Sequence, residues 1–503
     1  MSPFARDLVE HYGRPEYAGG DRLTGAAQAI EQILGAAAQA LDYRRMAALS
    51  ALVGSATDWR TEARPMVGSL FRLAWPILVE NLLQTALGVT SLVIVARLGA
   101  TAVAAVGLGN QFVQLLLVTF AGLAVGNTAI VARAIGAGDR ADAARATRQA
   151  LILAAGLGLL VGVVAFGASG AVLRLTGAAP DVVAEGEPYL RILGTGAVLM
   201  ALMLVGGGTL RGAGDTVTPM AATLVTNVVN VAAAYVLVFG YLGAPALGVA
   251  GAAWAAVLAR SLGVGLILWR LVRGGKAPAL GWHGWRPHRA SVLRVARIGG
   301  PAAVEQLVVQ LGLMAFSMVT VHIGTAAFAA QQIVFNAAQL SQLPGMAFSV
   351  AATTAVGQAL GAGSPRRAAM AGWLAFGSAA VWMSALGITY VVFAERWLRL
   401  YSDDAEILAL GASVMGMLAL CQPIQAAAYV LSGALRGAGD TRTTMWGGLL
   451  GTCGVRVPVA WVAGVVLGLG LYGVWLGWMA DWALRAAIYT LRFKSGRWQG
   501  SQV

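Results

Sequence analysis

The chain has 503 residues, of which 58% are hydrophobic and only 11% are charged, and its mean hydropathy is +0.72. A soluble domain carries roughly a quarter charged residues, so this composition excludes a large soluble core. The net charge of +13 would suit a nucleic-acid partner only on a soluble basic module, which the sequence lacks. Long apolar segments approach the ~20 residues that a helix needs to cross a bilayer. We therefore predict an all-α polytopic membrane protein, in contact with the lipid bilayer and without a nucleic-acid partner.

Residues 1–64 precede the first long apolar segment and are rich in charge. Ile30, Ile33, Leu34 and Leu41 recur at three- and four-residue steps, a spacing typical of an amphipathic helix. Such a helix would lie on the membrane surface. A solvated, partly disordered appendage is the alternative, and we assign this N-terminal cytoplasmic extension no chemistry.

Polar breaks divide the rest of the chain into expected spans. The first six lie near residues 66–96, 102–135, 143–169, 186–209, 217–240 and 247–270, and the last six near residues 291–321, 326–359, 367–393, 406–433, 442–466 and 472–493. Because six is an even number, both sets would enter the membrane in the same direction. The pattern therefore predicts twelve transmembrane helices in two parallel six-helix repeats.

A repeated hexapeptide supports this division. The segment Arg211-Gly212-Ala213-Gly214-Asp215-Thr216 returns 225 residues later as Arg436-Gly437-Ala438-Gly439-Asp440-Thr441, and the same offset carries Pro76-x-x-x-Glu80 onto Pro301-x-x-x-Glu305. This shared register indicates a tandem duplication. We expect a first repeat at 65–273, a cytoplasmic linker at 274–290, a second repeat at 291–494 and a cytoplasmic tail at 495–503.

The distribution of Lys and Arg between the short loops predicts the orientation. One set of connections is rich in basic residues: Arg140, Arg145, Arg148, Arg211, Arg270, Arg273, Lys276, Arg286, Arg289, Arg366, Arg367, Arg436, Arg442, Lys494 and Arg497. The opposite set holds fewer: Arg97, Arg174, Arg396 and Arg399. Because basic loops stay on the cytoplasmic side, we expect both termini on the cytoplasmic side of a bacterial-type inner membrane.

Each hexapeptide would lie at a cytoplasmic helix end. Its two glycines permit a tight reversal, and Asp215 or Asp440 can cap the next helix by accepting backbone N–H bonds. Arg211 and Arg436 can reach headgroups or the last carbonyls of the preceding helix. We interpret these four residues as a structural motif, because a phosphate-binding loop needs a different spacing with Lys-Ser/Thr.

Glu80 and Glu305 are the leading candidates for ion coupling. Each follows a proline by one helical turn, at equivalent positions of the two repeats. Ionisable residues at membrane depth are costly and by default mark a pathway or proton relay. The alternative is a purely structural pairing with nearby basic groups such as Arg72 and Arg297. The sequence leaves both interpretations open, with Glu305 slightly favoured for coupling.

Two further charged positions lie within the last spans. Asp481 precedes Arg485 by four residues, the spacing of an ion pair on one helix face, and we interpret it as a structural pair. Arg456 would either snorkel to the interface or line a cavity, and the sequence does not decide between these.

Uncharged polar and aromatic residues within the spans suit a tolerant binding surface for amphipathic compounds. The candidate substrate-cavity residues are Gln84, Asn230, Tyr235, Gln332, Asn336, Gln425 and Tyr429. Many such side chains only bridge helices by hydrogen bonds. We expect no cofactor, no metal and no catalytic residues, since no His/Cys/Asp/Glu cluster is visible.

Together these features resemble the multidrug and toxic compound extrusion (MATE) transporters. The resemblance rests on the twelve spans, on Pro76-x-x-x-Glu80-Asn81-x-x-Gln84-Thr85, on Arg97-Leu98-Gly99 and on the hexapeptide, and it extends from about residue 65 to 494. It implies a monomeric secondary active efflux transporter for organic cations or amphipathic drugs. Export would be in antiport with protons or sodium ions, by alternating access.

The chain departs from the family at its known coupling acids. By the resemblance, one branch has Asp where this chain has Ser91 and Ala234, although the accompanying Asn230 is kept. The sodium-coupled branch has acids at the positions of Val309 and Gln425. These departures leave the coupling ion open.

Two other function classes compete with the antiporter. A flippase for lipid-linked saccharides would need a basic inward cavity, for which Arg456 and Arg97 are the in-span candidates. A membrane-embedded enzyme would need clustered acid, base or nucleophile residues at depth, and only His322 lies near a span. We therefore expect a transporter, not an enzyme.

Overall fold

The computed structural model describes residues 56–281, 285–286 and 288–501. The amphipathic helix predicted around residues 30–52 lies outside them. The chain divides after Arg64 into two units, and the unit of residues 65–503 is described below. Every regular element among the described residues is a helix, which confirms the all-α prediction.

The first repeat holds the helices up to Arg273. They are α4 (Ala56–Ala96), α5 (Ala100–Gly136), α6 (Arg140–Leu175), α7 (Pro180–Thr195), α8 (Ala197–Gly212), α9 (Val217–Phe239), η1 (Tyr241–Gly243) and α10 (Gly248–Arg273). The fourth span is broken, because α7 and α8 meet at an angle of 47°.

The second repeat and the tail after it hold the remaining helices. They are α11 (Arg289–Ile323), α12 (Thr325–Gly361), α13 (Pro365–Val392), α14 (Ala394–Arg399), α15 (Ala405–Gly437), α16 (Thr441–Leu449), η2 (Leu450–Arg456), α17 (Val457–Trp461), η3 (Val462–Val466), α18 (Gly470–Lys494) and η4 (Arg497–Gly500). The segments η2 and η3 are π-helical, so the eleventh span is wound irregularly, whereas its counterpart α9 is regular.

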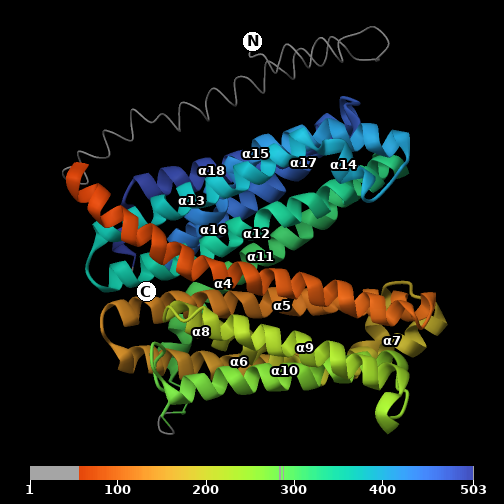
Figure 1. Ribbon diagram of the computed structural model, residues 1–503, viewed down its shortest axis with the longest axis horizontal. Coiled ribbons are helices and arrows are strands. Elements are labelled where there is room, and N and C mark those ends of the chain that lie inside the picture. The colour runs from red at the N-terminus through yellow and green to blue at the C-terminus, as the bar shows by residue number, and fades with distance from the viewer. Residues whose placement is uncertain (1–55, 282–284, 287, 502–503) are drawn as a thin grey trace. The chain divides into compact units, whose positions relative to one another are not determined.

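Among the described residues, ten helices are long and apolar enough to cross a membrane, or eleven if the bent α7–α8 pair counts as one span. The twelfth expected span is α18, which carries Asp481 and Arg485 between its apolar residues. Figure 1 shows α5 to α10 gathered in one bundle and α12 to α18 in another, as the duplication predicts.

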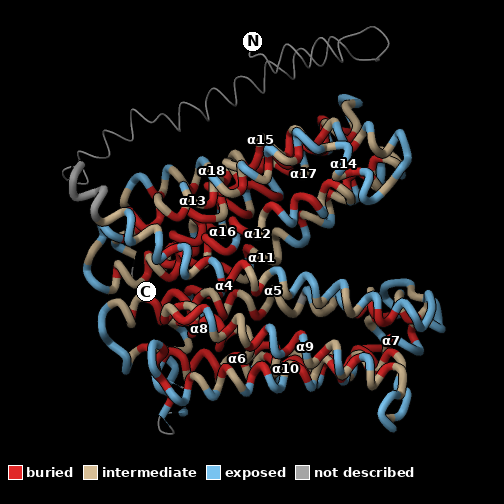
Figure 2. Tube along the Cα trace, in the orientation of Figure 1, coloured by how far each residue is buried: buried red, intermediate tan, exposed pale blue. Residues whose placement is uncertain are grey.

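The first helix of each repeat is shared between the two bundles. Leu70 and Ile77 of α4 belong to the buried core of the second bundle, whereas Val95 near the end of α4 belongs to that of the first. Helix α11 does the reverse, since Val295 packs in the core of the first bundle and Phe316 in that of the second. Each of these helices therefore crosses from one core to the other along its length, and buried residues line both cores (Figure 2).

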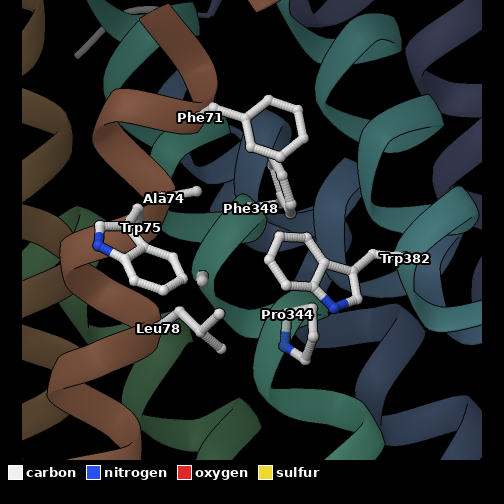
Figure 3. A pocket seen from close by; sticks show the side chains of 8 residues that line it. Phe71, Ala74, Trp75, Leu78, Pro344, Phe348 and Trp382 are labelled. Carbon is white, nitrogen blue, oxygen red and sulfur yellow. The ribbon is translucent and has the colours of Figure 1, made fainter. Parts of the chain in front are cut away.

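A small apolar pocket lies where α4 meets the second bundle (Figure 3). Phe71 and Trp75 of α4 face Pro344, Phe348 and Trp382 across it. The rings of Phe71 and Phe348 meet edge-on, with their centroids 5.1 Å apart. An edge-to-face aromatic contact of this kind is favourable, and it helps to fix the start of α4 against α12 and α13.

The repeats also touch through α5 and α12, near the hexapeptides. A Cβ at Gly357 would lie 2.8 Å from the Cβ of Ala132, so only glycine allows α12 to approach α5 this closely. Beside it, the Thr354 hydroxyl donates to the carbonyl of Arg211 at 3.0 Å, and the Gln358 amide donates to the carbonyl of Gly212 at 2.9 Å. This end of the interface between the repeats is therefore closed by tight packing and hydrogen bonds.

Candidate functional site

The repeated glutamates pair with the repeated arginines of the hexapeptides. Arg211 Nη1 donates to both carboxylate oxygens of Glu80 at 3.0 Å. Arg436 Nη2 donates to Glu305 Oε1 at 2.6 Å. The glutamates are buried, with 9% and 6% of their side chains exposed, and the arginines are 15% and 19% exposed. Both repeats thus hold the same ion pair at equivalent positions.

These partners differ from those suggested by the sequence. Arg72 and Arg297 are exposed, and Arg211 and Arg436 reach inward to the acids instead of toward headgroups. The physical reason is burial, because a carboxylate removed from water requires a charged partner. Both pairs are separated by the same 131 residues, as the common offset of 225 residues requires.

The glutamates lie where α4 and α11 cross between the two cores. Glu80 follows Ile77, which packs in the second core, and precedes Val95, which packs in the first. Glu305 lies between Val295 and Phe316, with the order of the cores reversed. A change in either ion pair would therefore act where one helix joins the two bundles.

The hexapeptide aspartates act as the sequence predicts. Asp215 Oδ1 accepts the backbone N–H of Thr218 at 3.1 Å, and Asp440 Oδ1 accepts that of Thr443 at 3.4 Å. Their second oxygens accept from the guanidinium groups of Arg270 and Arg492, at 3.1 and 2.6 Å respectively. Each aspartate therefore both caps a helix start and ties it to the last helix of its repeat.

The predicted pair of Asp481 and Arg485 is confirmed, with Arg485 Nε 2.6 Å from Asp481 Oδ1. Arg456 joins it, because its Nη2 forms an ion pair with Asp481 Oδ2. The Arg456 side chain is only 1% exposed, and its guanidinium lies 4.3 Å from the ring centroid of Trp478. Arg456 is thus held inside the second bundle, which does not favour a flippase that would present it to a lipid headgroup.

The predicted substrate-cavity residues are divided between the two bundles. Gln84, Gln332 and Asn336 are exposed on α4 and α12. In the first bundle, Asn230 is buried, while Tyr235 is 44% exposed and its ring stacks on that of Tyr241, with the centroids 5.1 Å apart.

In the second bundle, Gln425 is fully buried and the Tyr429 hydroxyl donates to Gln342 at 2.7 Å. Neither of the pockets on α4/α12/α13 and on α13/α15 is lined by the predicted cavity residues. The structure therefore gathers only part of this set, around the buried charges of the second bundle.

A family model shows which proteins the chain is related to. The MatE model matches residues 76–236 and again residues 301–462, more than half of the chain and once in each repeat. The chain belongs to the MATE family. It is therefore an integral membrane transporter and not an enzyme.

Individual relatives and a solved structure match most of the chain. A protein of Thermotoga maritima, described as a probable multidrug resistance protein NorM, is 30% identical over 86% of this chain and 92% of its own. The multidrug resistance protein PmpM of Pseudomonas aeruginosa is 29% identical over 80% of this chain and 85% of its own. A solved structure of a MOP superfamily transporter from Pyrococcus furiosus shares the fold, with a TM-score of 0.79, 24% identity and coverage of 86% of this chain and 95% of that chain.

The tryptophans in the last span of this MATE chain were not singled out by the sequence analysis. Trp475, Trp478 and Trp482 recur at three- and four-residue steps on one face of α18, and the Arg456 guanidinium lies over the rings of Trp478 and Trp482. Their spacing was a visible signal in the sequence. Nothing in it showed that this face meets Arg456 of another span.

Proposed function

We propose that this chain is a secondary active multidrug efflux transporter that exports organic cations or amphipathic compounds in antiport with protons or sodium ions. The relatives named as multidrug resistance proteins match it over most of their length. The observation that carries the mechanism is the arrangement of equivalent residues along α5 and α12.

Two equivalent pairs of residues mark the ends of this interface. Ala132 and Gly357 are buried against each other at the closed end. Gln114 and Gln339, eighteen residues earlier on each helix, are both exposed. Eighteen residues make about five helical turns, so a straight α12 would carry Gln339 on the same face as Gly357, about 27 Å along the helix, with Pro344 between them. We infer that the faces which meet at one end separate at the other.

This separation supports alternating access, in which two repeats rock about a central site. The exposed amides of Gln114, Asn336 and Gln339 offer hydrogen bonds without fixed charge, which suits cargo of varied structure. In the predicted orientation, the closed end of the interface, near the hexapeptides, lies on the cytoplasmic side of an inner membrane. In that orientation the exposed amides face outward, where cargo is released.

We propose Glu305, with Glu80 as its counterpart, as the coupling groups. When the glutamate binds a proton or sodium ion, its pair with Arg436 or Arg211 weakens. That change acts where α11 or α4 joins the two cores. A ligand shifts a conformational equilibrium only through different affinities for the two states, and breaking a pair that stabilises one state supplies such a difference.

The test is transport into everted membrane vesicles, with pH and sodium gradients imposed separately. Glu305→Gln removes the charge and should retain substrate binding but lose gradient-driven transport. Glu395→Gln is the matched control, because Glu395 forms an exposed ion pair with Arg399. Rates are normalised to the amount of folded protein. Transport at the wild-type rate by both Glu305→Gln and Glu80→Gln would refute the coupling proposal. Absence of any substrate transport by the wild-type protein would refute the proposed function itself.

A further inference from the structure

The interior of the second bundle holds an excess of positive charge. Asp481 is fully buried between Arg456 and Arg485, so two guanidinium groups share one carboxylate. Glu305, the next acid near Arg485, is already paired with Arg436. One positive charge is therefore left without a counter-charge among the described residues of this core. An uncompensated charge at such a site is costly.

The same place has a surplus of hydrogen-bond donors. Nε and Nη1 of Arg456 are buried and meet no acceptor within the described part of the chain. The same holds for the indole N–H groups of Trp475, Trp478 and Trp482. Arginine and the tryptophan indole only donate, so another donor could not satisfy these groups. Gln425 Oε1 and Asp481 Oδ2 are acceptors that also lack a hydrogen bond among the described residues, but the unpartnered donors outnumber them. A ligand here must therefore bring acceptors and negative charge.

The fold itself does not require this cluster. At the equivalent positions of the first repeat, 225 residues earlier, Arg456 is matched by Val231, Asp481 by Ala256 and Trp478 by Ala253. The first bundle thus has apolar residues at the positions of Arg456, Asp481 and Trp478, and it keeps an arginine, Arg260, at the position of Arg485. Arg456 also ends the π-helical segment η2, whose counterpart in α9 is regular. Such π-helical segments are frequent at functional sites.

We propose that Arg456, together with the indole N–H groups beside it, binds a small monovalent anion inside the second bundle. Asp481 holds the Arg456 guanidinium in place, and Trp478 covers one of its faces. The chemistry fits a halide or a carboxylate, because each accepts several hydrogen bonds and supplies one negative charge. The anion is either dissolved chloride or the carboxylate group of a transported compound.

The experiment measures bromide binding to the purified full-length protein in detergent, with sulfate, a divalent anion, as the counter-anion and no carboxylate in the buffer. Tryptophan fluorescence reports binding, because three of the donors are indoles, and anomalous diffraction from bromide locates the ion. We expect saturable quenching and a bromide peak beside Arg456. Arg456→Gln should weaken bromide binding about tenfold or more, since a charged hydrogen bond is lost. Arg396→Gln, at an exposed cation–π contact, is the control and should bind as the wild type does.

Arg456→Gln should still fold, because Asp481 keeps Arg485 as its partner. Its thermal midpoint should no longer rise with bromide, whereas that of the wild type should rise and saturate. The source of the anion is identified by competition between a zwitterionic drug and its methyl ester. Displacement of bromide by the acid alone indicates a cargo carboxylate, and displacement by neither indicates chloride. Absence of saturable binding to the wild type, or unchanged binding to Arg456→Gln, would overturn the proposal. Both readouts are independent of transport.

Discussion

Glu305 accepts a hydrogen bond from Arg436 at 2.6 Å, and the equivalent pair of the first repeat joins Glu80 to Arg211 at 3.0 Å. Each pair connects a helix shared by both bundles to the arginine of a hexapeptide. Because the ion pair recurs in both repeats, it is a feature of the repeated unit and not of the packing in one repeat alone. It is both a structural contact and the group that we propose for coupling, and these roles can be separated.

The first prediction uses a double-mutant cycle. Glu305→Gln leaves the partly buried Arg436 without its charged partner, which should lower the unfolding free energy by about 1–3 kcal/mol. Adding Arg436→Gln should recover most of this loss, since the unpaired charge is removed. Transport should remain lost in the double variant if Glu305 carries the coupling ion. The four proteins are compared by thermal unfolding and by vesicle transport, and additive stability losses would contradict the pairing.

The second prediction concerns Asp440. Asparagine keeps a capping oxygen for Thr443 but loses the charged contact to Arg492, whereas alanine loses both. Loss of a cap costs about 0.5–2 kcal/mol, so Asp440→Ala should be less stable than Asp440→Asn. The amount of folded protein should fall in that order, with the choice of driving ion unchanged. A selective loss of ion coupling in well-folded Asp440→Asn would contradict a structural role.

The third prediction tests the closed end. Gly357→Ala places a methyl group against Ala132, and overpacking costs about 1–3 kcal/mol. The opposite conformation should gain roughly five-fold or more in population. In a background without native cysteines, disulfide formation between Gln114→Cys and Gln339→Cys should become faster.

Gly377→Ala is the control for that experiment, because a Cβ at Gly377 meets no atom within 4 Å. It should leave the crosslinking rate unchanged. Equal rates in both glycine variants would mean that Gly357 does not stabilise the closed end.

The fourth prediction distinguishes the two partners in the buried charge cluster. Asp481→Asn leaves Arg456 and Arg485 without a carboxylate. It should lower the free energy of unfolding by about 3–5 kcal/mol, as breaking a buried ion pair does. Arg456→Gln keeps the pair of Asp481 with Arg485 and should cost far less. Thermal unfolding in a halide-free buffer measures both. A larger loss for Arg456→Gln would mean that its stacking on Trp478 outweighs the electrostatics.

The fifth prediction concerns orientation. Ala362 is exposed beside the hexapeptide end, and Asp403 is exposed in the loop between α14 and α15. A membrane-impermeant thiol reagent applied to intact cells should label Asp403→Cys and not Ala362→Cys. In everted vesicles the result should reverse. Labelling of Ala362→Cys from outside would place the hexapeptides, and with them both termini, on the outer side of the membrane. That result would contradict the predicted orientation.

The sequence alone determined the membrane class, the helical fold, the duplication and the family. These follow from apolar run lengths and from one offset shared by many landmarks, and neither depends on contacts between distant residues. It also determined local contacts, such as the pairing of Asp481 with Arg485 and the capping by Asp440, because helix geometry relates residues three or four positions apart.

The tertiary structure alone decided which distant charges meet. Glu305 has basic neighbours in its own helix, yet its partner is Arg436, which lies 131 residues away. Arg456 and Asp481 come from different spans, and their contact depends on how the irregular η2 packs against α18. The physical reason is that burying a charge is so costly that partners are selected by the packing of whole helices, which sequence spacing does not describe.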